Sequence, residues 1–121
     1  KSAKAAYSEA NFSLSMAASG GYKAGQEGKV EIVLEAKAPF HANDKYPYKF
    51  KTQESPGVTY PVAVVKKDQA KVENMKVTMP VAFTVADAGK QRVSGVFHFS
   101  VCTDDKCLIE KRALAVDVDV K

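Results

Sequence analysis

Apolar and polar residues alternate along most of the chain, which is the pattern of β-strands with one buried face. The clearest stretch is Lys76–Val85, and its apolar residues fall on one face of a single ten-residue strand: Val77, Met79, Val81, Phe83 and Val85. Pro80 lies on the opposite face and indicates an edge or a bulge, because proline cannot donate a ladder hydrogen bond. This segment is therefore predicted to be a strand that packs one face against a core.

The same alternation, bounded by turn-forming residues, recurs through the rest of the sequence. It predicts further strands at Asn11–Ala18, Lys29–Ala38, Tyr46–Thr52, Val58–Lys66, Gln91–Cys102 and Leu108–Val120. No segment keeps a 3.6-residue apolar period over about ten residues, so helices should be short or absent. We expect an all-β fold, an immunoglobulin-like antiparallel β-sandwich of about seven to eight strands.

Composition narrows the class of protein further. The 121 residues suit one domain (1–121), and we expect Lys1–Ala10, which is small and polar, to be a flexible lead-in left after removal of a leader. The chain has no apolar run near the roughly 20 residues of a membrane span. Its net charge of +4 comes from lysines scattered along the strands, and tryptophan is absent. These features argue against a membrane span and against nucleic-acid binding, and we expect a monomer.

The most distinctive chemical feature is the pair Cys102 and Cys107. The four residues between them, Thr103–Lys106, are polar and turn-forming, so the segment is predicted to be the tip of a β-hairpin. Opposed residues of antiparallel strands have Cα atoms about 4.5–5.5 Å apart, which is a separation that a disulfide accepts. The two thiols can therefore bond without movement of the backbone.

Three uses of this pair remain open from the residues alone: a structural disulfide, thiol–disulfide exchange and metal binding. Closing so short a loop stabilises a fold by only about 2 kcal/mol, whereas a bridge at a hairpin tip is accessible to a partner's thiolate. Asp104 and Asp105 disfavour a thiolate while Lys106 favours one. His98 lies about 13 Å along the strand from Cys102, too far to act as its base. From the residues alone a structural disulfide ranks first. If the pair is redox-active, we expect it to exchange with an activated partner rather than to act as the initiating nucleophile.

Metal binding is the weakest of these three hypotheses. A zinc site could combine Cys102, Cys107, His41 and His98, but the spacing of the histidines matches no finger or ribbon. A copper site could use the histidines with three methionines: Met16, Met75 and Met79. Met16 and Met79 lie on predicted inward faces, where core packing explains them better. We therefore expect neither a metal nor another cofactor.

Several segments together resemble the N-terminal periplasmic domain of the DsbD family of thiol:disulfide interchange proteins. The resemblance spans roughly Lys29 to Val120, and its most specific element is the C-x4-C-L motif in Val101–Leu108, which follows a strand rich in aromatic residues. The other segments that carry it are Phe40–Pro47, Pro56–Val58, Lys76–Val81 and Val93–Ser100.

The resemblance implies an immunoglobulin-like fold and a role in electron transfer. Cys102 and Cys107 would be the redox-active pair, one receiving attack and the other resolving the mixed disulfide. The implied partner is a thioredoxin-like protein or a membrane-embedded thiol reductase, and the implied location is the periplasm or another exported compartment, with a lipid anchor before Lys1 left open. The alternative is a non-enzymatic immunoglobulin-like module, for binding or structure, that keeps a hairpin disulfide.

Overall fold

The computed structural model describes residues 3–121, and almost every regular element in it is a β-strand. The strands are β1 (Ala6–Ser8), β2 (Phe12–Ala18), β3 (Glu27–Ala36), β4 (His41–Ala42), β5 (Lys49–Thr52), β6 (Val58–Thr59), β7 (Val64–Lys66), β8 (Lys71–Val72), β9 (Lys76–Val85), β10 (Gly89–Cys102) and β11 (Cys107–Val120). One short 3-10 helix, η1, covers Lys67–Gln69. Across residues 3–121, no helix is both long and apolar enough to cross a bilayer.

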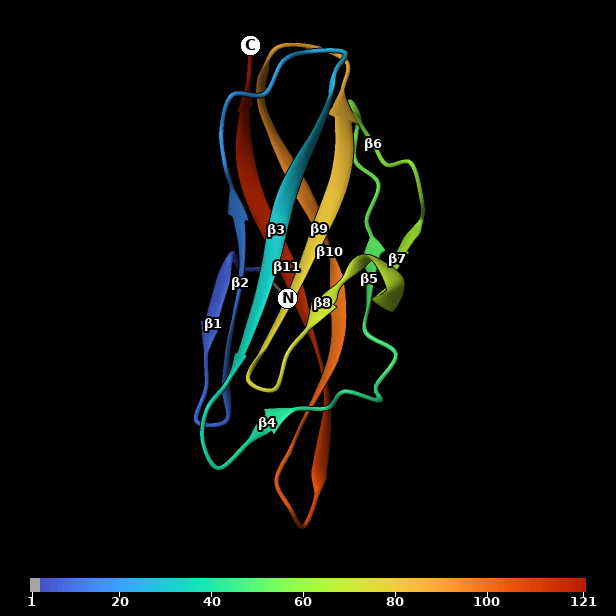
Figure 1. Cartoon of the computed structure of the whole chain (residues 1–121). Coiled ribbons are helices and arrows are strands. Elements are labelled where there is room, and N and C mark those ends of the chain that lie inside the picture. The colour runs from blue at the N-terminus through green and yellow to red at the C-terminus, as the bar shows by residue number, and fades with distance from the viewer. Residues whose placement is uncertain (1–2) are drawn as a thin grey trace.

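These strands form two antiparallel sheets that face each other (Figure 1). The first sheet has the order β1-β2-β3-β9-β6, with β8 also paired to β9. The second has the order β11-β10-β5-β7, with β4 also paired to β10. The predicted all-β sandwich is confirmed, and it has the two-sheet architecture of immunoglobulin-like domains.

The core lies between the sheets and is built from the inward residues that the alternation predicts. Phe12 of the first sheet meets Phe99 of the second edge to face, with ring centroids 4.9 Å apart, and Phe97 stacks on Phe99 at 5.5 Å. Met16 and Met79 are also buried in this core. Their burial confirms the predicted inward positions of these two methionines.

The first sheet agrees closely with the sequence pattern. β9 has the predicted bounds, and Pro80 lies where β9 pairs only with β3, because β8 and β6 pair with the two ends of β9. A proline is tolerated at such a locally free edge.

The segment Lys1–Ala10, predicted to be a flexible lead-in, contains the strand β1. This strand pairs with β2, and the Tyr7 hydroxyl donates a hydrogen bond of 2.6 Å to the Ala113 carbonyl. Lys1 and Ser2 lie outside the described residues.

The middle of the chain departs most from the predicted strands. The predicted strand Val58–Lys66 is two strands in different sheets, since β6 pairs with β9 and β7 pairs with β5. Pro61 lies in the crossing between them, where a ladder hydrogen bond is not required. Tyr46–Thr52 contributes only the strand β5. Short edge strands raise the number of strands above the seven or eight expected.

Candidate functional site

The two cysteines lie at the end of the β10–β11 hairpin, as the sequence predicts. Cys102 and Cys107 are directly opposed in the register, their Cα atoms are 4.0 Å apart, and they form a disulfide. The turn is closed by a hydrogen bond of 2.7 Å from the Thr103 amide to the Lys106 carbonyl. The Thr103 hydroxyl also accepts the amides of Asp105 and Lys106, each at 3.2 Å. We call this disulfide-closed end, Val101–Leu108, the hairpin tip.

The two sulfur-bearing residues differ strongly in exposure. Cys102 is only 5% exposed, whereas Cys107 is exposed. The difference arises because β10 has a neighbour on each side at this point: β11 on one side and β4 on the other, with His41 opposite Cys102. At this end β11 pairs only with β10 among the described residues, so Cys107 faces solvent. Only one end of the disulfide is open to a partner.

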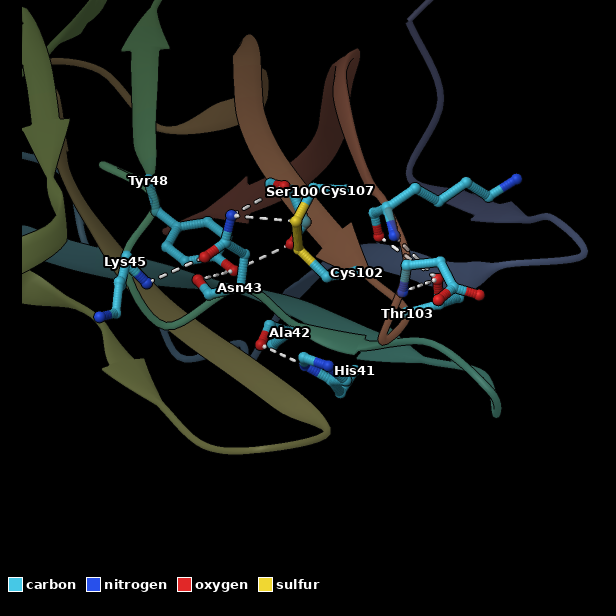
Figure 2. Close-up of a disulfide and its surroundings, with 11 residues drawn as sticks. His41, Ala42, Asn43, Lys45, Tyr48, Ser100, Cys102, Thr103 and Cys107 are labelled. Carbon is cyan, nitrogen blue, oxygen red and sulfur yellow. Dashed lines mark hydrogen bonds between the residues drawn. A yellow bond between two sulfur atoms is a disulfide. The ribbon is translucent and has the colours of Figure 1, made fainter.

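Asn43 connects the segment after β4 to the disulfide and to β10 (Figure 2). Its backbone amide donates to the Ser100 carbonyl at 3.1 Å. Its side-chain amide donates to the Ser100 hydroxyl at 3.3 Å and contacts the Cys107 Sγ at 3.9 Å. Its side-chain oxygen accepts the Lys45 amide at 3.0 Å. This one asparagine fixes the loop against the outer face of the hairpin.

Tyr48 anchors the other end of the same loop. Its hydroxyl donates to the carbonyl oxygens of Asn43, at 2.7 Å, and Ser100, at 3.0 Å. Burial raises the pKa of Tyr48 well above its usual value, so the phenol stays protonated and available as a donor. Ser100 is fully buried beneath the loop. The loop therefore holds β4, and with it His41, beside Cys102.

The structure does not gather the ligands of the zinc hypothesis. His41 lies opposite Cys102, but His98 pairs with Lys111 further along β10, and both sulfurs are committed to the disulfide. Within the described part of the chain, no three His, Cys, Asp or Glu side chains come together in a way that could hold a metal ion.

His41 and Asn43 lie in Phe40–Pro47, a segment that enters the sequence analysis through the DsbD resemblance. Apart from the zinc hypothesis, which groups His41 with the cysteines, the sequence pattern does not predict that either residue contacts the hairpin. The contacts depend on pairing between segments more than fifty residues apart, which alternation along a strand cannot reveal.

The comparisons with known proteins do not identify a family. No family model matches the chain, and no curated protein matches it. Among solved structures, a similar chain is AggA, the major subunit of aggregative adherence fimbriae type I from Escherichia coli, at 6% identity. The match covers 95% of this chain and 99% of that chain, with a TM-score of 0.44. We draw no functional argument from so distant a likeness, and the resemblance to the DsbD domain stays a prediction.

Proposed function

We propose that this domain is a non-enzymatic, protein-binding module and that it binds through the outer face of the β10–β11 hairpin next to the disulfide. The observation that carries the proposal is Ile109, which is 72% exposed two residues beyond Cys107 on the same outward face. Its neighbours on that face are fixed by the disulfide and by Asn43. An apolar side chain on a rigid frame can bind a partner at a small cost in conformational entropy.

The disulfide has a structural task at this position. In Figure 1 the orange and red hairpin extends past the neighbouring strands at one end of the sandwich. Near the tip its further partners within residues 3–121 are β4, which pairs with just two residues of β10, and the loop residues Asn43 and Tyr48, which bond to Ser100. A two-stranded hairpin without neighbours is marginally stable in water. A disulfide keeps the projecting end in one conformation. Its structural role at the hairpin tip is therefore larger than the short length of the closed loop alone suggests.

The role of the bridge as a staple can be tested by replacing both cysteines. Cys102→Ser together with Cys107→Ser should lower the free energy of unfolding by about 2 kcal/mol, the value for closing a loop of this length. Hydrogen exchange should accelerate at the amides of the hairpin tip and remain unchanged in β3 and β9. The control is Asp105→Asn, an exposed turn residue whose side chain makes no hydrogen bond in the described structure. Unchanged exchange at the tip would show that the disulfide is not what holds it.

Thiol–disulfide exchange, the function that the DsbD resemblance implies, is the second candidate. It is favoured by the asymmetry of the bridge, because only Cys107 is open to attack. A thiolate of a partner dithiol would bond to the Cys107 sulfur, and the electron pair of the broken S–S bond would leave on Cys102. The partner's second thiolate would then attack the partner's own sulfur in the mixed disulfide and release Cys107. The pair gains two electrons and two protons, and the partner's dithiol becomes a disulfide.

In this second candidate, the partner would be a thioredoxin-like protein or a membrane-embedded thiol reductase, and the setting would be the periplasm. A disulfide agrees with export to an oxidising compartment under either function.

Single-cysteine variants separate the two candidates. If exchange is the function, Cys102→Ala should form a stable mixed disulfide at the exposed Cys107 with a thioredoxin-like protein that keeps only its attacking cysteine, supplied as the disulfide with thionitrobenzoate. Cys107 displaces thionitrobenzoate, and neither protein then has a second thiol that could resolve the adduct. The matched variant Cys107→Ala retains only the buried Cys102 and should form far less adduct. Non-reducing electrophoresis and mass spectrometry measure both. If neither variant forms an adduct and the reduction potential of the wild type lies below about −300 mV, thiol–disulfide exchange is excluded and the binding module is the remaining candidate.

A further inference from the structure

Four basic side chains stand in one line across the outer face of the second sheet. Lys111 of β11 is opposite His98 of β10, His98 is opposite Lys49 of β5, and Lys49 is opposite Lys66 of β7. We call these four residues the basic row. Neighbouring strands are about 4.8 Å apart, so the row spans roughly 14 Å. All four are exposed or partly exposed, because the inward positions beside them are taken by Phe97, Phe50 and Val65.

The three lysines of the basic row are not ion-paired within the described residues. Lys51 lies in the adjoining line of the same face and adds a further charge. Burial, together with the charges of Lys49, Lys51 and Lys111, lowers the pKa of His98, which agrees with their mutual proximity.

The other end of the same two strands is arranged differently. There Arg92 is opposite Asp117, with Nε and Oδ1 3.2 Å apart, and Lys90 is opposite Asp119. Like charges placed directly opposite one another destabilise a sheet, whereas opposite charges stabilise it. The hairpin therefore pairs its charges at one end, whereas nearer the disulfide Lys111 is opposite His98, and on the strands beside the hairpin Lys49 is opposite Lys66. A local loss of stability from opposed like charges is expected where a surface binds a partner.

We infer that the basic row binds an acidic face of a partner protein, which also covers Ile109. This inference rests on the proposed function, and it adds the chemistry of the partner. Ile109 is two residues closer to the tip than Lys111 and lies on the same face of β11, so the apolar side chain and the basic row are contiguous. An apolar centre with a polar rim is the usual anatomy of a protein interface. Complementary charge would orient the partner and speed its association.

A nucleic acid fits this surface less well. Phosphate recognition favours arginine, and the basic row contains none. Both arginines of the chain are engaged with carboxylates elsewhere: Arg92 with Asp117, and Arg112 with Glu110 at 3.0 Å. Lysine ammonium groups at strand spacing suit separate carboxylates on a protein surface instead.

The test measures binding of a short fluorescein-labelled peptide rich in glutamate, and of the same peptide with glutamine in place of glutamate, by fluorescence anisotropy at low ionic strength. The wild type should prefer the glutamate peptide. Replacing the three lysines of the row (Lys49→Gln, Lys66→Gln and Lys111→Gln) should weaken binding of the glutamate peptide about tenfold, since three exposed charge pairs are lost. The matched control replaces three exposed lysines elsewhere: Lys23→Gln, Lys76→Gln and Lys90→Gln. It removes the same net charge and should weaken binding much less.

The outcomes distinguish this inference from the proposed function. Equal losses in the two triple variants would overturn the inference, because net charge alone would then explain binding. Tighter binding of a single-stranded oligonucleotide or of vesicles containing phosphatidylglycerol would also overturn it. Ile109→Ser tests the hairpin surface separately. If Ile109→Ser weakens binding of both peptides equally while the triple variant of the basic row has no effect, the proposed binding surface is supported and the inference of an acidic partner is wrong. If only the triple variant of the basic row weakens binding, the acidic partner is supported and the contact with Ile109 is wrong.

Discussion

Phe99→Ala should lower the free energy of unfolding by about 3–5 kcal/mol, the range for removal of a fully buried aromatic side chain. Phe99 has no exposed surface, and its ring touches Phe12 of the opposite sheet and Phe97 of its own strand. The change removes a contact between the two sheets and leaves a cavity that rigid strands cannot close. Denaturation in urea, followed by circular dichroism, measures the loss as a lower midpoint at an unchanged slope.

The control for this prediction is Ile109→Ala on the facing strand. Ile109 points outward and is 72% exposed, so its truncation should change the free energy of unfolding by less than about 0.5 kcal/mol. The two residues lie on adjacent strands near the same end of the hairpin, and Phe99 pairs with Glu110, the next residue after Ile109. Similar losses in both variants would mean that the inward and outward faces of the hairpin are wrongly assigned.

Where a strand keeps one face buried along its whole length, the sequence predicts it well. β9 has the predicted bounds because its alternation is unbroken for ten residues. The cysteine hairpin is also predictable, since a polar loop of four residues between two alternating segments fixes the pairing locally. In both cases the information lies within a short stretch of chain, and the hydrophobic effect alone selects the buried face.

The split of Val58–Lys66 shows what alternation leaves undetermined. Val58 and Val65 are both buried, yet they are seven positions apart. In one continuous strand an odd separation would place them on opposite faces. The chain resolves this conflict by crossing from one sheet to the other between them. The parity of the two valines, together with Pro61, was the available signal for the break.

The candidate site was predictable only in its cysteines. Asn43 reaches Ser100 across fifty-seven positions, and the basic row collects residues from four strands. In the sequence these lysines are scattered along several strands, so their spacing alone predicts only an ordinary solvated surface. Their alignment depends on the register between β5, β7, β10 and β11, and register is a property of the folded sheet.

The register that aligns the basic row depends on Gly95, which lies in β10 opposite Thr52 of β5. A methyl group at this position would overlap the Lys51 carbonyl oxygen and would lie 2.5 Å from the Cζ of Phe50. Phe50 is fully buried, and the carbonyl belongs to a strand that is paired on both sides, so neither can move alone. A glycine within a strand marks such a close approach of two backbones.

Gly95→Ala should therefore lower the free energy of unfolding by about 3 kcal/mol, toward the upper end for overpacking a core. β5 must shift away from β10, and Lys49 and Lys51 move with it. The affinity for the glutamate peptide should then fall although no charge has changed. Ser94→Ala is the matched control, because its hydroxyl makes no hydrogen bond within the described residues and its truncation leaves the strands in place. If Gly95→Ala matches Ser94→Ala in both stability and peptide affinity, the spacing of the basic row does not depend on this contact.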